Sequence, residues 1–156
     1  MKDPNSLTQV SEFHSTFKHP IQPAPAIPSE QRCKLRVSLL AEELKELEAA
    51  IQDKNIVEVA DALCDLQYVL SGAILEFGLG EKFKELFDEV HRSNMSKACK
   101  KEDEAKQTIE FYKAKENTES YFKESEGRFL VYRKSDDKTL KSVNYSPADL
   151  AKIVHQ

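Results

Sequence analysis

Tryptophan is absent from this 156-residue chain, and glycine and cysteine are scarce, with four and three residues. Charged residues make up 32% of the chain and hydrophobic residues 40%. This composition is typical of a helical globular protein and argues against a β-sandwich or a disordered tail. The length fits one domain with a core of its own, although a helical chain of this size can also depend on a partner subunit.

The three cysteines do not form a recognisable framework. Cys33, Cys64 and Cys99 are an odd number, and more than thirty residues separate each from the next. Such spacing fits neither a disulfide framework nor a zinc ribbon. Cys33 and Cys64 lie in apolar helical sequence, where a small buried hydrophobe is the ordinary role. We predict three reduced cysteines without a catalytic function.

Long apolar runs and basic stripes are also missing. No apolar stretch approaches the roughly 18 residues of a membrane span, and the first ten residues lack the apolar core of a signal peptide. The sequence therefore predicts a cytoplasmic protein with no membrane partner. The net charge is −4 and lysine and arginine are scattered, which argues against polymeric nucleic acid as a partner.

Hydrophobic periodicity predicts an all-α protein, a helical bundle with a short C-terminal β-hairpin and helix. The predicted helices of the bundle and its N-terminal extension span residues 6–19, 29–52, 56–77, 81–94 and 102–115. Ser6 and Gln9 match a capping box, Ser29 can cap the second helix, and Asn55 the third. The third helix is apolar nearly all round, which predicts a central position.

Two segments depart from the helical pattern. Four prolines between residues 20 and 28 predict an extended strap across the bundle surface. Residues 128–133 and 139–143 predict a β-hairpin around a polar turn, and Ser146 followed by Pro147 predicts a last helix over 147–154. We divide the single domain into the N-terminal helix and strap (1–28), the catalytic bundle (29–116) and the C-terminal hairpin and helix (117–156).

Two groups of carboxylates occupy one side of consecutive helices. At about 100° of rotation per residue, Glu42, Glu43 and Glu46 share one wedge of the second helix, whereas Glu48 falls on the solvent side. The next helix places three more acids within roughly 60° of one another in an otherwise apolar segment. These are Glu58, Asp61 and Asp65.

Acids in apolar surroundings require a compensating cation, because desolvating ionised carboxylates costs several kcal/mol each. No lysine or arginine occurs between Ile56 and Phe77. A ligand set of carboxylates without histidine is the preference of Mg²⁺, with Mn²⁺ as a substitute, and argues against zinc. Because Mg²⁺ usually shares its shell with substrate phosphates, the site predicts a phosphate ester as substrate.

The order Glu42-Glu43-x-x-Glu46 followed by Glu58-x-x-Asp61 resembles the signature of the all-α nucleoside triphosphate pyrophosphohydrolases. That superfamily includes MazG, the dimeric dUTPases and phosphoribosyl-ATP pyrophosphohydrolase, and the flanking segments are most similar to its MazG-like, phosphoribosyl-ATP pyrophosphohydrolase-like branch. The resemblance covers about residues 31–97 and extends to flanking segments at 13–14 and 144–147. It implies a helical bundle of the all-α nucleoside triphosphate pyrophosphatase type. It implies Mg²⁺-dependent cleavage of a nucleoside triphosphate into a monophosphate and pyrophosphate, and a homodimer or a dimer of dimers.

Carried over by motif, the resemblance implies five catalytic and metal-binding residues. Glu43, Glu46, Glu58 and Asp61 would be the core Mg²⁺ ligands. Glu42 would complete a second metal position or orient the attacking water. Asp65 lies outside the minimal motif, so it is either a further ligand or a partner of a nearby lysine or arginine.

Six further residues are candidates for contacts with the nucleotide. They are His14, Arg92, Asn94, Lys97, Lys141 and Tyr145. Each has a structural alternative: a packed histidine for His14, a polar helix end for the residues at 92–97, and a purely structural appendage in place of a lid for Lys141 and Tyr145. The sequence leaves both readings open.

Three other functions compete with triphosphate hydrolysis. Phosphoribosyl-ATP is an alternative substrate within the same superfamily. A non-catalytic helical protein that binds calcium or a basic partner would also carry acids, although it has no reason to place Glu58 and Asp61 inside an apolar helix. A di-iron oxidase is disfavoured because the histidine ligands of that class are missing.

Overall fold

The computed structural model describes residues 2–156, which form two compact units, one ending at Phe83 and the other beginning at Lys84. The elements of the first unit are α1 (Ser6–Phe17), α2 (Glu30–Gln52), α3 (Ile56–Glu76) and the short 3₁₀ helix η1 (Gly80–Lys82). Those of the second are α4 (Phe83–Met95), α5 (Glu102–Glu116), β1 (Ser120–Ser125), β2 (Arg128–Arg133) and α6 (Leu150–Val154). The predicted fold class, helical with a small hairpin and a last helix, is confirmed.

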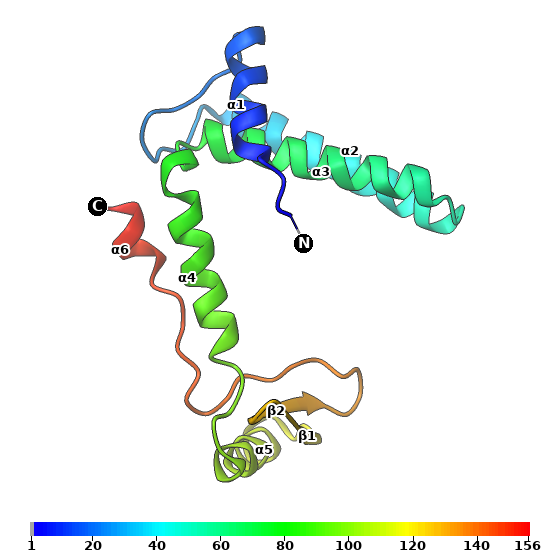
Figure 1. Cartoon of the computed structure of the whole chain (residues 1–156), viewed down its shortest axis with the longest axis vertical. Helices are drawn as coiled ribbons and strands as arrows, with labels where there is room; N and C mark the ends of the chain where they lie inside the picture. The colour runs from blue at the N-terminus through cyan, green and yellow to red at the C-terminus, as the bar shows by residue number, and fades with distance from the viewer. Residues whose placement is uncertain (1) are drawn as a thin grey trace. The chain divides into compact units, whose positions relative to one another are not determined.

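Two of the three predicted caps are present in the first unit. The side chain of Ser29 accepts a hydrogen bond from the Arg32 amide, and that of Asn55 accepts from the amides of Val57 and Glu58. The predicted capping box at Ser6 is wrong, because Ser6 is already helical and no side chain caps α1. A tight turn between α2 and α3 folds the two long helices against each other, and α1 lies across α3 (Figure 1).

The proline-rich strap runs along the C-terminal end of α3, as predicted. The amide of Gln22 donates to the carbonyl of Leu75, and the amide of Ala26 donates to that of Phe77. Gly78 ends the helix with φ +68°, and a Cβ at this position would lie 1.9 Å from the carbonyl oxygen of Ala24. Glycine is therefore required here both by the backbone conformation and by the close approach of the strap.

The prediction that the third helix is central does not hold within one chain. The C-terminal half of α3 is buried, including Ile74 and Leu75. Its N-terminal half is exposed: Ile56 retains 76% of its accessible surface and Leu63 retains 51%. The helices of this unit bury only one end of α3, so part of its apolar surface is left for another partner.

The hairpin is present, but its main strand partner differs from the predicted one. β2 pairs along its whole length with the preceding strand β1, with Phe122 opposite Val131, and meets the predicted partner segment 139–143 only at its start. Glu126 and Gly127 form the turn with φ of +50° and +72°, and two positive φ angles suit the twist of a two-residue hairpin. Thr139 makes only an isolated bridge to Tyr132.

The core of the second unit lies between α5 and the hairpin. Its buried members are Cys99, Ala105, Val131 and Leu140. The last helix starts at Leu150 rather than at Pro147, because the side chain of Asp149 caps it by accepting a hydrogen bond from the Lys152 amide. The prediction of a Ser146 cap is therefore wrong by three residues.

Among the described residues, no single helix has both the length and the apolar character needed to cross a membrane. The broken pair Ile56–Glu76 and Gly80–Met95 satisfies the two criteria only when it is counted together.

Candidate functional site

The acids of α2 and α3 face one another across the helix pair. Burial and four neighbouring negative charges raise the pKa of the Glu43 carboxyl above its usual range. In descending order of effect the charges belong to Glu46, Asp65, Glu42 and Asp61. Two of these come from the same helix and two from the facing one, so the fold brings together carboxylates separated by up to 22 positions in sequence. Glu58 is not among the charges that act on Glu43.

Most of these side chains are exposed. Glu43 is half-buried, whereas the other five acids of the two groups are open to solvent in the single chain. The expectation that they lie in apolar surroundings is therefore not met by one chain alone. Within residues 2–156, no three acidic, histidine or cysteine side chains are arranged closely enough to hold a metal ion without rearrangement.

None of the six carboxylates is neutralised by a lysine or arginine among the described residues. Burial raises the pKa of Glu43 most, and the repulsion between crowded like charges without a counterion raises it further. A divalent cation would relieve it, and the oxygen-only donor set suits Mg²⁺ or Mn²⁺. The residues present thus fit a hard divalent cation.

His14 belongs to an internal network rather than to this acidic surface. Its ring is 2% exposed, Nδ1 lies 2.9 Å from the Pro20 carbonyl oxygen, and Nε2 lies 3.4 Å from Nη2 of Arg36. Burial lowers the pKa of His14, against the opposing effect of the hydrogen bond to Pro20. The packed, hydrogen-bonded histidine is the arrangement that the structure displays.

The same network contains a buried ion cluster that sequence reasoning missed. Glu76 is 1% exposed and accepts hydrogen bonds from Arg32, at 3.1 Å from Nε, and from Arg36. Burial acts to raise the pKa of Glu76, but the two arginines outweigh it and hold the pKa below its usual range. The sequence signal was an acid near the C-terminal end of an apolar helix, where no local cation is available.

Gly72 makes room for this network. A Cβ at Gly72 would lie 2.8 Å from Nη1 of Arg36 and 3.0 Å from Nε2 of His14. Its backbone therefore allows the close approach of two side chains from α1 and α2.

The other five predicted nucleotide contacts all lie in the second unit, where most have internal partners. Arg92 donates to Glu89, to Ser146 Oγ at 3.0 Å and to the Pro147 carbonyl. That pairing, together with the Asp149 amide, lowers the pKa of Glu89 to about 2. The remaining contacts are Lys97 Nζ to Asn94 Oδ1 at 2.8 Å, Tyr145 Oη to Ser93 Oγ at 2.9 Å, and Lys141 Nζ 4.6 Å above the Tyr145 ring.

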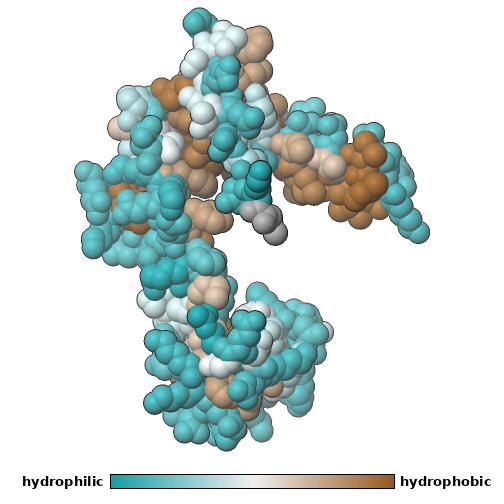
Figure 2. Space-filling view, viewed as in Figure 1, coloured by the Kyte–Doolittle hydropathy of each residue, from teal (hydrophilic) through white to brown (hydrophobic). Residues whose placement is uncertain are grey.

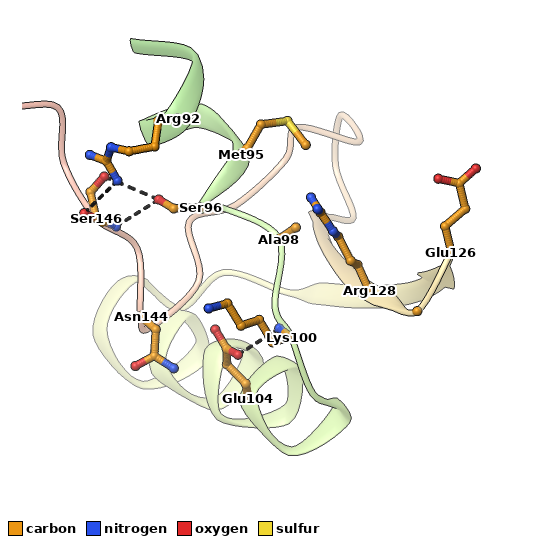
Figure 3. Close-up of a pocket in the computed structure, with 11 residues that line it drawn as sticks. Arg92, Met95, Ser96, Ala98, Lys100, Glu104, Glu126, Arg128, Asn144 and Ser146 are labelled. Carbon is orange, nitrogen blue, oxygen red and sulfur yellow. Dashed lines mark hydrogen bonds between the residues drawn. The ribbon is translucent and has the colours of Figure 1, made fainter. Parts of the chain in front are cut away.

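A cavity of about 710 Å³ lies within the second unit (Figure 3). Arg92 is the only predicted nucleotide contact that lines it. Lys100 and Arg128 also line it, and Glu104 stands beside them, already accepting hydrogen bonds from Ser142 and the Lys100 amide. The cavity therefore offers mixed charge rather than a cluster of unpaired cations.

An apolar face covers the helix pair away from the acids. On α2 its most exposed members are Val37, Leu44 and Ile51, with 67%, 59% and 58% of their surface accessible. Leu63 and Leu70 continue it on α3 with 51% and 43%. Figure 2 shows apolar surface gathered on the α2–α3 pair. This apolar face is therefore a candidate interaction surface.

Comparison with known proteins places these helices in a family. The chain is 34% identical over 121 residues to an uncharacterized protein of Acanthamoeba polyphaga mimivirus, a match that covers 73% of this chain and 47% of the relative. The chain thus spans about half the length of that relative. The family model of phosphoribosyl-ATP pyrophosphohydrolase matches residues 10–94, more than half of the chain and all six carboxylates. This chain belongs to the phosphoribosyl-ATP pyrophosphohydrolase family, within the all-α nucleoside triphosphate pyrophosphohydrolase superfamily.

Proposed function

We propose that the chain is a Mg²⁺-dependent nucleoside triphosphate pyrophosphohydrolase that releases a nucleoside monophosphate and pyrophosphate. Family membership supports hydrolysis of a pyrophosphate bond. The observation that carries the finer proposal is the crowding of Glu43 by acids of both helices, with no ion pair to a lysine or arginine among residues 2–156. A site that lacks its own cation is suited to a substrate that arrives together with metal ions.

In this proposal Glu43, Glu46, Glu58 and Asp61 hold the metal, and Glu42 completes the site or accepts a hydrogen bond from the attacking water. Bound Mg²⁺ would neutralise the phosphates and lower the pKa of a water molecule. The water oxygen attacks the α-phosphorus, and the bond from this phosphorus to the oxygen bridging to the β-phosphorus breaks. The water proton passes to a carboxylate, and the bridging oxygen leaves with pyrophosphate.

Asp65 receives a narrower role. It faces Glu43 closely enough to raise the pKa of that carboxyl, and it has no lysine or arginine partner among the described residues. We therefore favour Asp65 as a further oxygen ligand, or as an acceptor for a metal-bound water, over the alternative of a partner for a basic side chain.

We also propose that two copies of the chain assemble through the apolar face of α2 and α3. Two helices from each copy would complete a four-helix core and cover Leu44, Ile51 and Leu63, which one chain leaves exposed. A dimer of dimers is the larger assembly compatible with this interface.

Phosphoribosyl-ATP is the second candidate substrate, because the family takes its description from the enzyme that hydrolyses it. The test is product analysis by ³¹P NMR after incubation of the full chain with Mg²⁺ and either a panel of nucleoside triphosphates or phosphoribosyl-ATP. Monophosphate and pyrophosphate from a triphosphate would support the first proposal. Turnover of phosphoribosyl-ATP alone would favour the second proposal. Release of a nucleoside diphosphate together with orthophosphate would contradict cleavage at the α-phosphorus.

A further inference from the structure

A second cavity, of about 400 Å³, lies in the first unit between the N-terminal segment and α3. The proposed chemistry gives it no role. It is lined from the N-terminal side by Pro4, Ser6, Gln9 and Val10, and from α3 by Leu63, Cys64, Gln67 and Tyr68. Mostly apolar walls with a few amide and hydroxyl groups are typical of sites for small organic ligands, and the volume suits a flat ring.

The cavity adjoins the acidic surface along α3. Cys64 directly precedes Asp65, and Tyr68 follows Asp65 by almost one helical turn. At 1.5 Å and 100° per residue, Tyr68 lies within about 20° of Asp61 and roughly 10 Å further along the helix. If the phosphates of a ligand lie at the carboxylates, a group joined to these phosphates through one sugar would therefore reach the cavity.

Tyr68 offers a flat surface at the cavity wall. Its ring is held edge-on against Phe13, with centroids 5.5 Å apart and planes at 83°, and the residue keeps 40% of its surface exposed. A braced aromatic ring with a free face favours stacking against another flat ring.

The amide of Gln67 has a defined orientation. Ser71 Oγ donates its one hydrogen to the backbone carbonyl of Gln67 at 2.8 Å. Towards the Gln67 side chain, Ser71 Oγ can therefore only act as an acceptor. Gln67 Nε2 lies 3.1 Å from Ser71 Oγ and 3.5 Å from Ser6 Oγ, which uses both of its hydrogens. Its Oε1 therefore remains a hydrogen-bond acceptor with no donor among the described residues.

From these contacts we infer that the cavity binds the nucleobase of the substrate, with Tyr68 as stacking surface and Gln67 Oε1 as acceptor for a base amino group. The inference rests on the proposed function, since it takes the phosphates to lie at the carboxylates. Cytosine suits a lone acceptor better than uracil. The imino N–H of uracil stands between two carbonyl oxygens, and both would face Gln67 Oε1 and be repelled by it.

Cys64 provides a test that does not depend on hydrolysis. It is exposed and lines the cavity, whereas Cys33 is half-buried and Cys99 is fully buried. We would measure the N-ethylmaleimide alkylation rate at each cysteine of the full chain by peptide mass spectrometry, with Mg²⁺. The probes are the α,β-methylene analogues of cytidine and uridine triphosphate, with pyrophosphate and ribose 5-phosphate as ligands that lack a base.

We expect the cytidine analogue to slow alkylation of Cys64 severalfold, at a lower concentration than the uridine analogue, and to leave Cys33 unchanged. Gln67→Leu should raise the protecting concentration about tenfold, the usual effect of losing one hydrogen bond in a binding site. Gln107→Leu, on the exposed side of α5, is the matched control. A melting temperature equal to that of wild type shows that Gln67→Leu is folded.

Equal protection by pyrophosphate or by ribose 5-phosphate, or no protection by nucleotides that the protein hydrolyses, would overturn the base site while leaving the hydrolase intact. Protection by the uridine analogue at the same or a lower concentration would overturn the role of Gln67. Base-dependent protection without turnover of any nucleotide would instead contradict the proposed hydrolase activity and support the base site.

Discussion

At the scale of single residues, Glu43 is the acid of this surface on which burial and neighbouring negative charges act together. Its carboxyl is half-buried and faces acids from both helices, and its pKa is raised. A carboxyl whose pKa is higher in the folded protein than in the unfolded chain destabilises the fold when ionised. That cost is present above the folded pKa and is lost as the pH falls through it.

Glu43→Gln should therefore raise the melting temperature of the metal-free protein at neutral pH. The difference from wild type should shrink as the pH falls and Glu43 takes up its proton. Mg²⁺ should stabilise wild type more than the variant, because the variant has lost a ligand. Thermal denaturation with and without EDTA, at pH values from about 4 to about 8, measures all three effects. A lower melting temperature for the metal-free variant would contradict the proposed repulsion.

At the buried cluster of Glu76 with Arg32 and Arg36, ionisation of the carboxyl has the opposite effect on stability. The pKa of Glu76 is held below its usual range, so its ionised form contributes stability that is lost as the pH falls through the folded pKa. Removing one partner of a buried ion pair leaves the others unpaired, at a cost of about 3 kcal/mol or more.

We predict that Glu76→Gln lowers the free energy of unfolding by about that amount, as measured by urea denaturation. Glu48→Gln is the control, because Glu48 is exposed on α2 and should change stability by less than about 0.5 kcal/mol. Equal stabilities of the two variants would show that the cluster does not hold α2 and α3 together.

At the scale of elements, comparing Gly78 with Gly127 separates the effect of backbone conformation from the effect of packing. Both have positive φ, +68° and +72°. A Cβ at Gly78 would collide with the strap backbone at Ala24, whereas a Cβ at Gly127 meets nothing within 4 Å. Only the first glycine is required by packing as well as by conformation.

Gly127→Ala should cost about 1 kcal/mol, the conformational penalty alone. Gly78→Ala should cost clearly more, because the strap must also move away from the end of α3. Urea denaturation gives the size of each effect, and hydrogen exchange at the amides of Gln22 and Ala26 locates it. Unchanged protection of these two amides in Gly78→Ala would contradict the contact between strap and helix.

The elements also show how far sequence reasoning extends. Local signals were sufficient for the caps at Ser29 and Asn55 and for the strap. They also placed Glu43 near acids of the facing helix. The hairpin partner was missed because Glu126-Gly127 is a turn with a weak signal, whereas the polar run at 135–138 has a stronger one. The Glu76 cluster was missed because its partners lie 40 and 44 positions away, a separation that periodicity within one helix does not reveal.

At the scale of the whole molecule, the apolar face of α2 and α3 stays uncovered in the single chain. Leu44 and Leu63 keep 59% and 51% of their surface exposed, on helices that otherwise form the most regular part of the chain. In the proposed dimer, a second copy supplies the helices that cover this face.

We predict that wild type sediments as a dimer or a dimer of dimers and that Leu44→Glu shifts it to monomer. A charge placed in an apolar interface loses its hydration without a partner, which weakens association by several kcal/mol. Phe111→Glu, on α5 and 44% exposed, is the control and should leave the assembly unchanged. Sedimentation of wild type as a monomer would contradict the proposed interface.

The central claim is that the facing acids of α2 and α3 form the catalytic metal site. Its most direct test is the initial rate of pyrophosphate release with saturating Mg²⁺ by wild type, Asp61→Asn and Glu48→Gln, on the triphosphate turned over fastest. Asp61→Asn keeps the side-chain shape and removes a ligand charge, so its kcat should fall by at least about a hundredfold, in line with the loss of several kcal/mol of transition-state stabilisation. Glu48→Gln should match wild type. Full activity of Asp61→Asn would contradict the account.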